Sequence, residues 1–220
     1  MARLLELSGL VLSDAAGPQR RGPDLSVDRG ECVVLHGGLD SGVGSVLRAA
    51  IGLESLLAGR VRLFGADPAG ADRTGDAALL ARVGWMPHRG ALISNLSLFE
   101  NLVLPLRWHR RAHGTPLRER AAEVLAWFGV VELPALNPGQ AGAVLCRKVA
   151  LARALILDPE LLILEDPADD LDPAATETIL AVLRRLAAQR GTGILLATCD
   201  PDLSRSFGDR CVTMPSPESP

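Results

Sequence analysis

Two residue types are nearly absent from this sequence of 220 residues: it has no tyrosine, and Lys148 is the one lysine among 23 basic residues. Any chemistry that needs an ammonium group must therefore use Lys148. The four cysteines lie far apart and form no C-x-x-C pair, which argues against a zinc site and against a secreted disulfide framework. We expect a reducing, cytosolic environment for the chain.

Two further absences exclude classes of protein. No stretch reaches about 18 consecutive apolar residues, so no membrane span is predicted. The formal net charge of −3 argues against a general nucleic-acid binder, which is normally basic. The apolar start of Met1–Glu6 hints at a signal peptide, but Glu6 interrupts it, so we predict a first β-strand there.

The sequence does contain enough apolar residues for a sizeable core. Hydrophobic residues make up 48% and charged residues 22% of the chain, which excludes wholesale disorder. The length fits one large domain, or a core domain that carries an inserted subdomain.

A glycine-rich loop follows a predicted buried strand, Val33–His36. The loop covers residues 37–44, and an apolar helix is predicted from about Ser45 to Leu57. A strand, a glycine loop and a helix in this order form a setting in which backbone amides and a helix N-terminus can hold an anion. A simple tight turn is the alternative interpretation of the loop.

The rest of the chain alternates between helical and strand patterns. Residues 97–157 are predicted to be mostly helical, with breaks at 114–116 and 134–139. Leu161–Leu164 is a continuous apolar run, typical of a central parallel strand. Pro173 suits the first position of a helix that we expect to end near residue 190, and a further strand is predicted at 193–197. The predicted fold class is therefore α/β.

The order of these segments resembles the ATP-binding subunit of ABC transporters over nearly the whole chain. Val149–Leu164 is similar to the helix after the family's signature and to the strand that carries its acidic pair, and Asp170-Leu171-Asp172-Pro173 resembles the D-loop. The resemblance implies the P-loop NTPase (ABC ATPase) fold, a RecA-like parallel-sheet core with an inserted α-helical subdomain. The expected boundaries are 1–94 and 158–214 for the core, 95–157 for the helical subdomain and 215–220 for a disordered tail.

One region resembles a narrower branch of the family. Gly90-Ala91-Leu92, Leu98–Leu102 and Pro105-Leu106-Arg107 are similar to the MlaF-type subunits of phospholipid (Mla/MCE) transporters. This resemblance implies lipid transport as the process in which the chain takes part.

The family's phosphate-binding loop has the pattern G-x-x-x-x-G-K-[ST], in which backbone N–H groups face the phosphates, Lys reaches the β and γ oxygens and the hydroxyl holds Mg²⁺. Gly37 and Gly42 have this spacing, but Val43 stands at the Lys position and Gly44 at the hydroxyl position. Ser45 comes one residue late, and Arg48 is expected to point away from the phosphates. The predicted vestigial phosphate loop consists of Gly37, Gly38, Asp40, Ser41, Gly42, Val43, Gly44 and Ser45.

The missing contacts are large enough to decide nucleotide affinity. Two charge-assisted hydrogen bonds contribute about 3–6 kcal/mol together, and an adenine-stacking aromatic contributes about 1–3 kcal/mol more. The family places a Tyr-like residue shortly after the first strand, where residues 11–14 of this chain contain no aromatic. A micromolar site would become millimolar or weaker, so no nucleotide cofactor is expected.

The other positions that the family uses for hydrolysis also differ. The acidic pair is Glu165-Asp166, the reverse of the family's Asp-Glu, so each side chain has the wrong length by one methylene. His88 stands at the position of the family's Gln, and Cys199 at that of its His. We therefore expect no catalytic residue among these four degenerate positions and no metal site. Ordinary solvated carboxylates are the alternative interpretation of the acidic pair.

The loops that reach the opposite subunit in the family are altered as well. An alignment without gaps places Ala141, Gly142, Ala143 and Val144 at the signature, with no hydroxyl among them. Residues 136–140 look more similar to a signature, but they lie five residues before the position that the alignment without gaps requires. Asp170 and Asp172 belong to the D-loop-like segment, and Asp172 also suits an N-cap. Lys148 stands where the family commonly carries Arg, so we expect it to be structural.

Together these departures predict a pseudo-ATPase, an ABC subunit that couples to or scaffolds a membrane permease. Family subunits pair head to tail, which implies a homodimer or a heterodimer with an ABC ATPase, peripheral on the inner face of the cytoplasmic membrane. Two alternatives stay open: an atypical but working ATPase, for which Mg-ATP would be the cofactor, and a soluble regulatory protein with the same fold. No nucleic acid partner is expected.

Overall fold

A five-stranded parallel sheet forms the centre of the molecule. The computed structural model describes residues 3–12, 20–38, 41–69, 76–109 and 115–215. Within them the strand order is β6-β7-β8-β4-β9, and every neighbouring pair is parallel. The strands are β6 (Val83–Met86), β7 (Leu161–Glu165), β8 (Gly193–Thr198), β4 (Cys32–His36) and β9 (Arg210–Thr213). The carboxyl ends of these strands therefore meet at one edge of the sheet.

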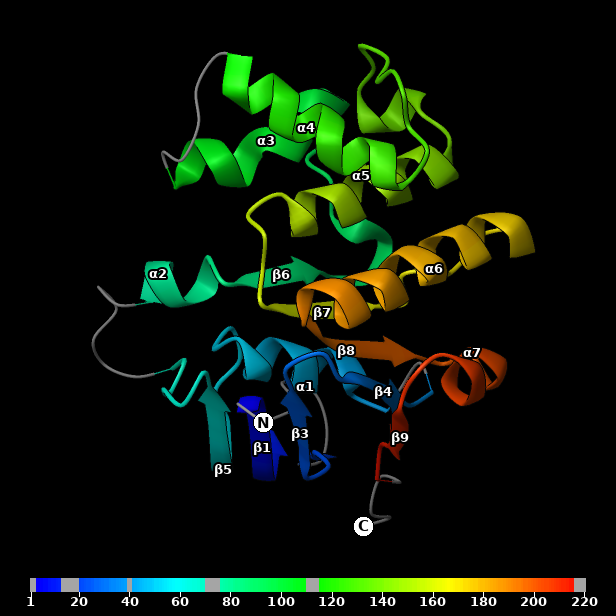
Figure 1. Cartoon of the computed structure of the whole chain (residues 1–220). Coiled ribbons are helices and arrows are strands. Elements are labelled where there is room, and N and C mark those ends of the chain that lie inside the picture. Colours follow the sequence, from blue (N-terminus) through cyan, green and yellow to red (C-terminus); the bar gives the residue numbers. More distant parts are fainter. Residues whose placement is uncertain (1–2, 13–19, 39–40, 70–75, 110–114, 216–220) are drawn as a thin grey trace.

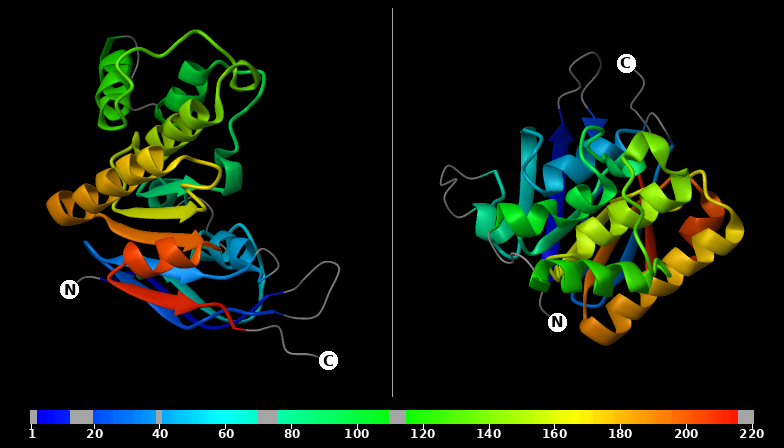
Figure 2. Two further views of the ribbon diagram at one scale, coloured as in Figure 1. Left: turned by 90° about the vertical axis from the view of Figure 1, so that its right-hand side faces the viewer. Right: turned by 90° about the horizontal axis from the view of Figure 1, so that it is seen from above.

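A second, antiparallel sheet covers one face of the first, as Figures 1 and 2 show. Its central strand β1 (Arg3–Leu12) pairs with β5 (Leu56–Leu63) on one side and with β2 (Arg20–Arg21) and β3 (Leu25–Asp28) on the other. Helix α1 (Val43–Ala50) lies between the two sheets and shares one apolar core with both of them. This arrangement fixes the first turn of α1 beside the carboxyl ends of β4 and β7.

Helices cover the opposite face. Figure 1 shows α3 (Leu98–Trp108), α4 (Thr115–Trp127) and α5 (Ala143–Leu155) gathered at one end of the molecule, with α6 (Pro173–Arg190) running along the sheet. The remaining helices are α2 (Asp76–Leu80) and α7 (Pro201–Ser206), with short 3-10 turns at η1 (His88–Gly90) and η2 (Pro138–Gln140). Leu162 and Leu164 point into the core under these helices, whereas Leu161 and Ile163 point toward α1. Burial on both faces explains why β7 is apolar throughout.

Several predicted elements are confirmed, namely the first strand, the central position of β7, the span of α6 and the strand at β8. The helix predicted for residues 45–57 is wrong at its end, because α1 stops at Ala50. Gly52 adopts a left-handed φ of 74° and its N–H donates to the carbonyl of Ala49 (3.0 Å), which turns the chain toward β5. Helix α4 begins at Thr115, inside a predicted break.

The predicted domain boundaries stay predictions, and residues 216–220 of the predicted tail lie outside the described part of the chain. Over the ranges described above, no helix is both long enough and apolar enough to cross a membrane.

Candidate functional site

The glycine loop leaves β4 and enters α1 at the carboxyl edge of the parallel sheet. The N–H of Gly37 donates to the carbonyl of Thr198 (3.2 Å), and the N–H of Ser41 donates to the carbonyl of Gly38 (3.0 Å). Gly42 adopts a left-handed φ of 81° immediately before the helix, a conformation that favours glycine. Asp40, also predicted to belong to this loop, lies outside the described residues.

Val43 is the first residue of α1, and it is buried in the apolar core between the two sheets. Its Cγ2 lies 2.8 Å from the point where a Cβ on Gly37 would stand, and Met214 reaches the same place. An apolar side chain therefore packs beneath the loop at the position where the family pattern requires an ammonium group.

The first turn of α1 presents a glycine flanked by two charged side chains. Oε1 of Glu165 lies 2.8 Å, and Nη1 of Arg48 lies 3.2 Å, from the point where a Cβ on Gly44 would stand. Arg48 also donates through Nη2 to Oγ of Ser45 (3.0 Å) and through Nε to Glu54 (2.9 Å). The hydroxyl oxygen of Ser45 therefore accepts a hydrogen bond from a side chain of the same helix. Arg48 lies four residues after Gly44 on the same helical face and leans back toward it. The expectation that Arg48 points away from bound phosphates stays a prediction.

The structure brings the four predicted degenerate positions together. Oε2 of Glu165 accepts a hydrogen bond from the backbone N–H of His88 (3.0 Å), and Oδ1 of Asp166 accepts one from the N–H of Cys199 (3.3 Å). Nδ1 of His88 lies 3.8 Å from Oδ2 of Asp166. Burial and the nearby Asp166 carboxylate raise the pKa of the Cys199 thiol. A neutral thiol is a weak donor, so Cys199 cannot replace a histidine that donates to phosphate.

Arg147 holds the segment after β7, a role that no sequence pattern indicated. Its buried guanidinium donates to the carbonyls of Asp166 (2.9 Å) and Asp169 (3.0 Å). Lys148, the next residue of α5, is half-buried, and its side chain forms no hydrogen bond or ion pair among the described residues. The structural role expected of Lys148 stays a prediction.

The signature-like and D-loop-like segments flank the start of two helices. Gly142 is the N-cap of α5 and, having no side chain, cannot cap the helix as a serine would; Ala141 precedes it and Ala143 and Val144 form the first turn. Residues 138–140 of the alternative segment form the separate turn η2. Asp172 caps α6 through a hydrogen bond from the N–H of Ala175 (2.9 Å), which confirms its predicted capping role. Asp170 adopts a left-handed φ of 59° and lines a pocket with Asp166 and Asp200.

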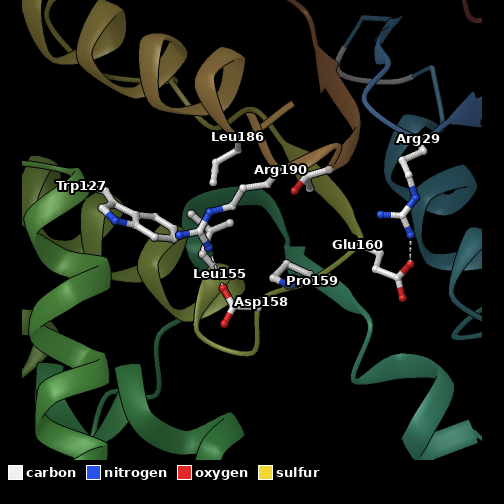
Figure 3. A pocket seen from close by; sticks show the side chains of 9 residues that line it. Arg29, Trp127, Leu155, Asp158, Pro159, Glu160, Leu186 and Arg190 are labelled. Carbon is white, nitrogen blue, oxygen red and sulfur yellow. Dashed lines mark hydrogen bonds and ion pairs between the residues drawn. The ribbon is translucent and has the colours of Figure 1, made fainter. Parts of the chain in front are cut away.

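A second pocket lies on the other side of the molecule, between α4, α6 and the segment that enters β7 (Figure 3). The guanidinium of Arg190 stacks over the ring of Trp127 at 4.5 Å and pairs with Oδ1 of Asp158 at 2.8 Å. Arg120 pairs with the same oxygen at 2.7 Å and donates to the carbonyl of Ile156 at 3.1 Å. We call Arg120, Trp127, Asp158 and Arg190 the clamp, because they join α4 to the carboxyl end of α6.

The residues of the loop do not fit the Mg-ATP that the resemblance implies. Val43 supplies no charge, Gly44 supplies no hydroxyl, and the space beside Gly44 holds the Glu165 carboxylate. Oγ of Ser41 is buried and has no hydrogen-bond partner within the described residues, but a hydroxyl brings no positive charge to a triphosphate. The described part of the loop therefore runs from β4 into the first turn of α1, and positions 43 and 44 lack the lysine and the hydroxyl of the family's pattern.

The comparisons with known proteins agree with the fold and the position of the loop. The sequence model of the ABC transporter family matches residues 21–169. The lipoprotein-releasing system ATP-binding protein LolD of Hyphomonas neptunium is 32% identical over 219 residues, covering 97% of this chain and 95% of LolD. The nickel import ATP-binding protein NikO of Rhodobacter capsulatus is also 32% identical, covering 97% of this chain and 86% of NikO.

Solved structures show the same fold. The dimeric structure of MJ0796, a bacterial ABC transporter cassette, superposes with a TM-score of 0.86 at 24% identity, covering 96% of this chain and 94% of MJ0796. The family match, the full-length relatives and the glycine loop between β4 and α1 lead to one conclusion. The chain belongs to the ABC transporter family, as one of its ATP-binding subunits.

Proposed function

We propose that this subunit is a pseudo-ATPase, which keeps the architecture of an ABC ATP-binding subunit and does not hydrolyse ATP itself. The observation that carries the proposal is the buried Val43 at the start of α1, where the family's chemistry requires a lysine. The engaged hydroxyl of Ser45 and the reversed Glu165-Asp166 pair support it.

The expected loss of affinity is large. Removing two charge-assisted hydrogen bonds to a nucleotide costs about 3–6 kcal/mol. This range corresponds to a weakening of about a hundredfold to ten-thousandfold. A micromolar affinity for Mg-ATP would therefore weaken to a Kd of about 0.1–10 mM, and no tightly bound nucleotide is expected.

A turnover assay tests the proposal directly. We expect no release of inorganic phosphate from Mg-ATP by the purified protein above that of its Asp166→Ala variant, and no saturable binding of micromolar affinity by calorimetry. Turnover that is present in the wild type and disappears in Asp166→Ala would refute the proposal. It would establish instead an atypical, working ATPase.

We further propose that the subunit works as a scaffold for a membrane permease, on the inner face of the cytoplasmic membrane and paired with itself or with an active ABC ATPase. The dimer described for MJ0796 supports the pairing. Deleting the chain should abolish assembly of the transporter, whereas Val43→Lys alone should leave transport unchanged. A complex that assembles normally without the chain would contradict the scaffold role, and failure to co-purify with any permease from membranes would favour a soluble regulatory protein.

Phospholipid is the transported substrate that we propose, on the similarity of Gly90–Leu92 and Leu98–Leu102 to Mla-type subunits. The relatives named above are described for lipoprotein release and nickel import, so they give this choice no support. Lipid analysis of the membrane complex that co-purifies with the tagged chain tests it. The branch is wrong if the co-purified permease is a metal or amino-acid importer.

A further inference from the structure

We propose that Gly44 and Glu165 form a matched pair, in which the longer acid fills, from within the chain, the space that a side chain at position 44 would need. This inference rests on the proposed function, because Gly44 stands at the position where the family's pattern carries the hydroxyl. It identifies Glu165 as the residue that fills the space beside Gly44.

The contact joins two elements that are far apart in the sequence. Glu165 is the last residue of β7, and Gly44 lies in the first turn of α1. Oε1 of Glu165 lies 2.8 Å from the Cβ position of Gly44, which is closer than a real Cβ tolerates. Glycine is therefore the residue that allows this carboxylate to rest against the helix.

The Glu165 carboxylate is held in place from its other side. Its Oε2 accepts a hydrogen bond from the backbone N–H of His88 at 3.0 Å. A Cβ added at position 44 would push Oε1 away and weaken this bond. Asp at position 165 lacks one methylene, so its reach is shorter by about 1.5 Å, and the space beside position 44 would open.

Charged side chains of opposite sign lie beside the Cβ position of Gly44. Arg48 brings Nη1 to 3.2 Å from the same Cβ position and donates through Nη2 to Ser45 at 3.0 Å. The missing side chain at Gly44 and the longer acid at Glu165 therefore belong to one arrangement.

A double-mutant cycle on the full chain tests the pairing without any nucleotide. The variants are Gly44→Ala, Glu165→Asp and the double variant, and the measurement is the Tm. Alanine is a better helix former than glycine, so where the site has room Gly44→Ala should raise the Tm by about 2–4 °C. We expect this rise in the Glu165→Asp background, and no rise or a decrease in the wild-type background.

Gly38→Ala is the matched control, because nothing lies within 4 Å of the Cβ position of Gly38. Its effect on the Tm should be the same in both backgrounds. Equal effects of Gly44→Ala in the two backgrounds would overturn the pairing, since contacting residues are expected to be non-additive.

The two proposals fail separately. Tight Mg-ATP binding by the wild type would refute the pseudo-ATPase and leave the Tm cycle unaffected. An additive Tm cycle would refute the pairing of Gly44 and Glu165, even where no nucleotide binds. If Gly44→Ala does not fold in the wild-type background, its recovery by Glu165→Asp supports the pairing and a lack of recovery overturns it.

Discussion

Replacing Asn101 by alanine is expected to destabilise the subunit more than most single changes outside the apolar core. The side chain of Asn101 is fully buried in the first turn of α3. Its Oδ1 accepts a hydrogen bond from the N–H of Ile93 (2.7 Å). Its Nδ2 donates to the carbonyls of Ile93 (3.0 Å), Leu96 (3.2 Å) and Ser97 (3.0 Å). One amide therefore holds the whole segment that leads into α3.

The magnitude follows from these contacts, in which the two hydrogens of Nδ2 are shared among three carbonyls. Each contributes about 0.5–1.5 kcal/mol net, and buried partners left without a bond cost more. We expect Asn101→Ala to lower the free energy of unfolding by about 3 kcal/mol, or the Tm by about 6–12 °C for a chain of this size. Asn101→Asp should be at least as destabilising, because an ionised carboxylate can accept from Ile93 but cannot donate to the three carbonyls.

Urea unfolding followed by circular dichroism measures this change, and a constant m-value shows that the same surface is exposed in each variant. Asn95→Ala is the control, since Asn95 is exposed six residues earlier and should change the free energy of unfolding by less than about 0.5 kcal/mol. The reasoning is refuted if Asn101→Ala costs less than about 1 kcal/mol.

Two further predictions concern the clamp and a buried thiol. Arg190→Ala should lower the free energy of unfolding by about 1 kcal/mol at low salt and by less at 0.5 M salt, because the pair with Asp158 is partly exposed and is screened; an unchanged urea midpoint at low salt would contradict this. Burial raises the pKa of the Cys32 thiol from 9.0 to about 11. The stability that the protonated thiol contributes is therefore complete below about pH 9. It is lost as the pH rises toward 11, at about 1.4 kcal/mol of unfolding free energy per pH unit. Cys32→Ala should show a flatter decline of stability between pH 9 and 10.5, and equal slopes in the two proteins would exclude this role for the thiol.

The elements with local signals could be predicted from the sequence. The apolar run Leu161–Leu164 correctly predicted β7, and Pro173 preceded by Asp172 correctly predicted the start of α6. Because β6, β7 and β8 are parallel neighbours, the residues that follow them had to meet at one edge, and His88, Glu165 and Cys199 do lie together.

The end of α1 could not be predicted from hydrophobicity. Leu53 and Leu57 extend the apolar pattern of the helix, but they are 63% and 55% exposed. The chain instead turns at Gly52, because Gly52 adopts the left-handed conformation that its missing Cβ permits. The spacing of apolar residues therefore predicted a longer helix, although Leu53 and Leu57 are not buried.

The detailed site depends on side-chain reach across elements, which no spacing along the chain encodes. The approach of Glu165 to Gly44 is set by the packing of β7 against α1. The direction of Arg48 is set by Ser45 and Glu54, two partners that a helical wheel does not single out. Asn101 and Arg147 were missed for the same reason, since their partners are backbone groups of other segments.

In the clamp, a single oxygen of Asp158 is shared by Arg120 of α4 and Arg190 of α6, with Trp127 beside both guanidinium groups. Neither helix can tilt alone without giving up its share of that oxygen. The shared carboxylate therefore couples the position of α4 to that of the carboxyl end of α6, so that a displacement of one helix alters the contacts of the other.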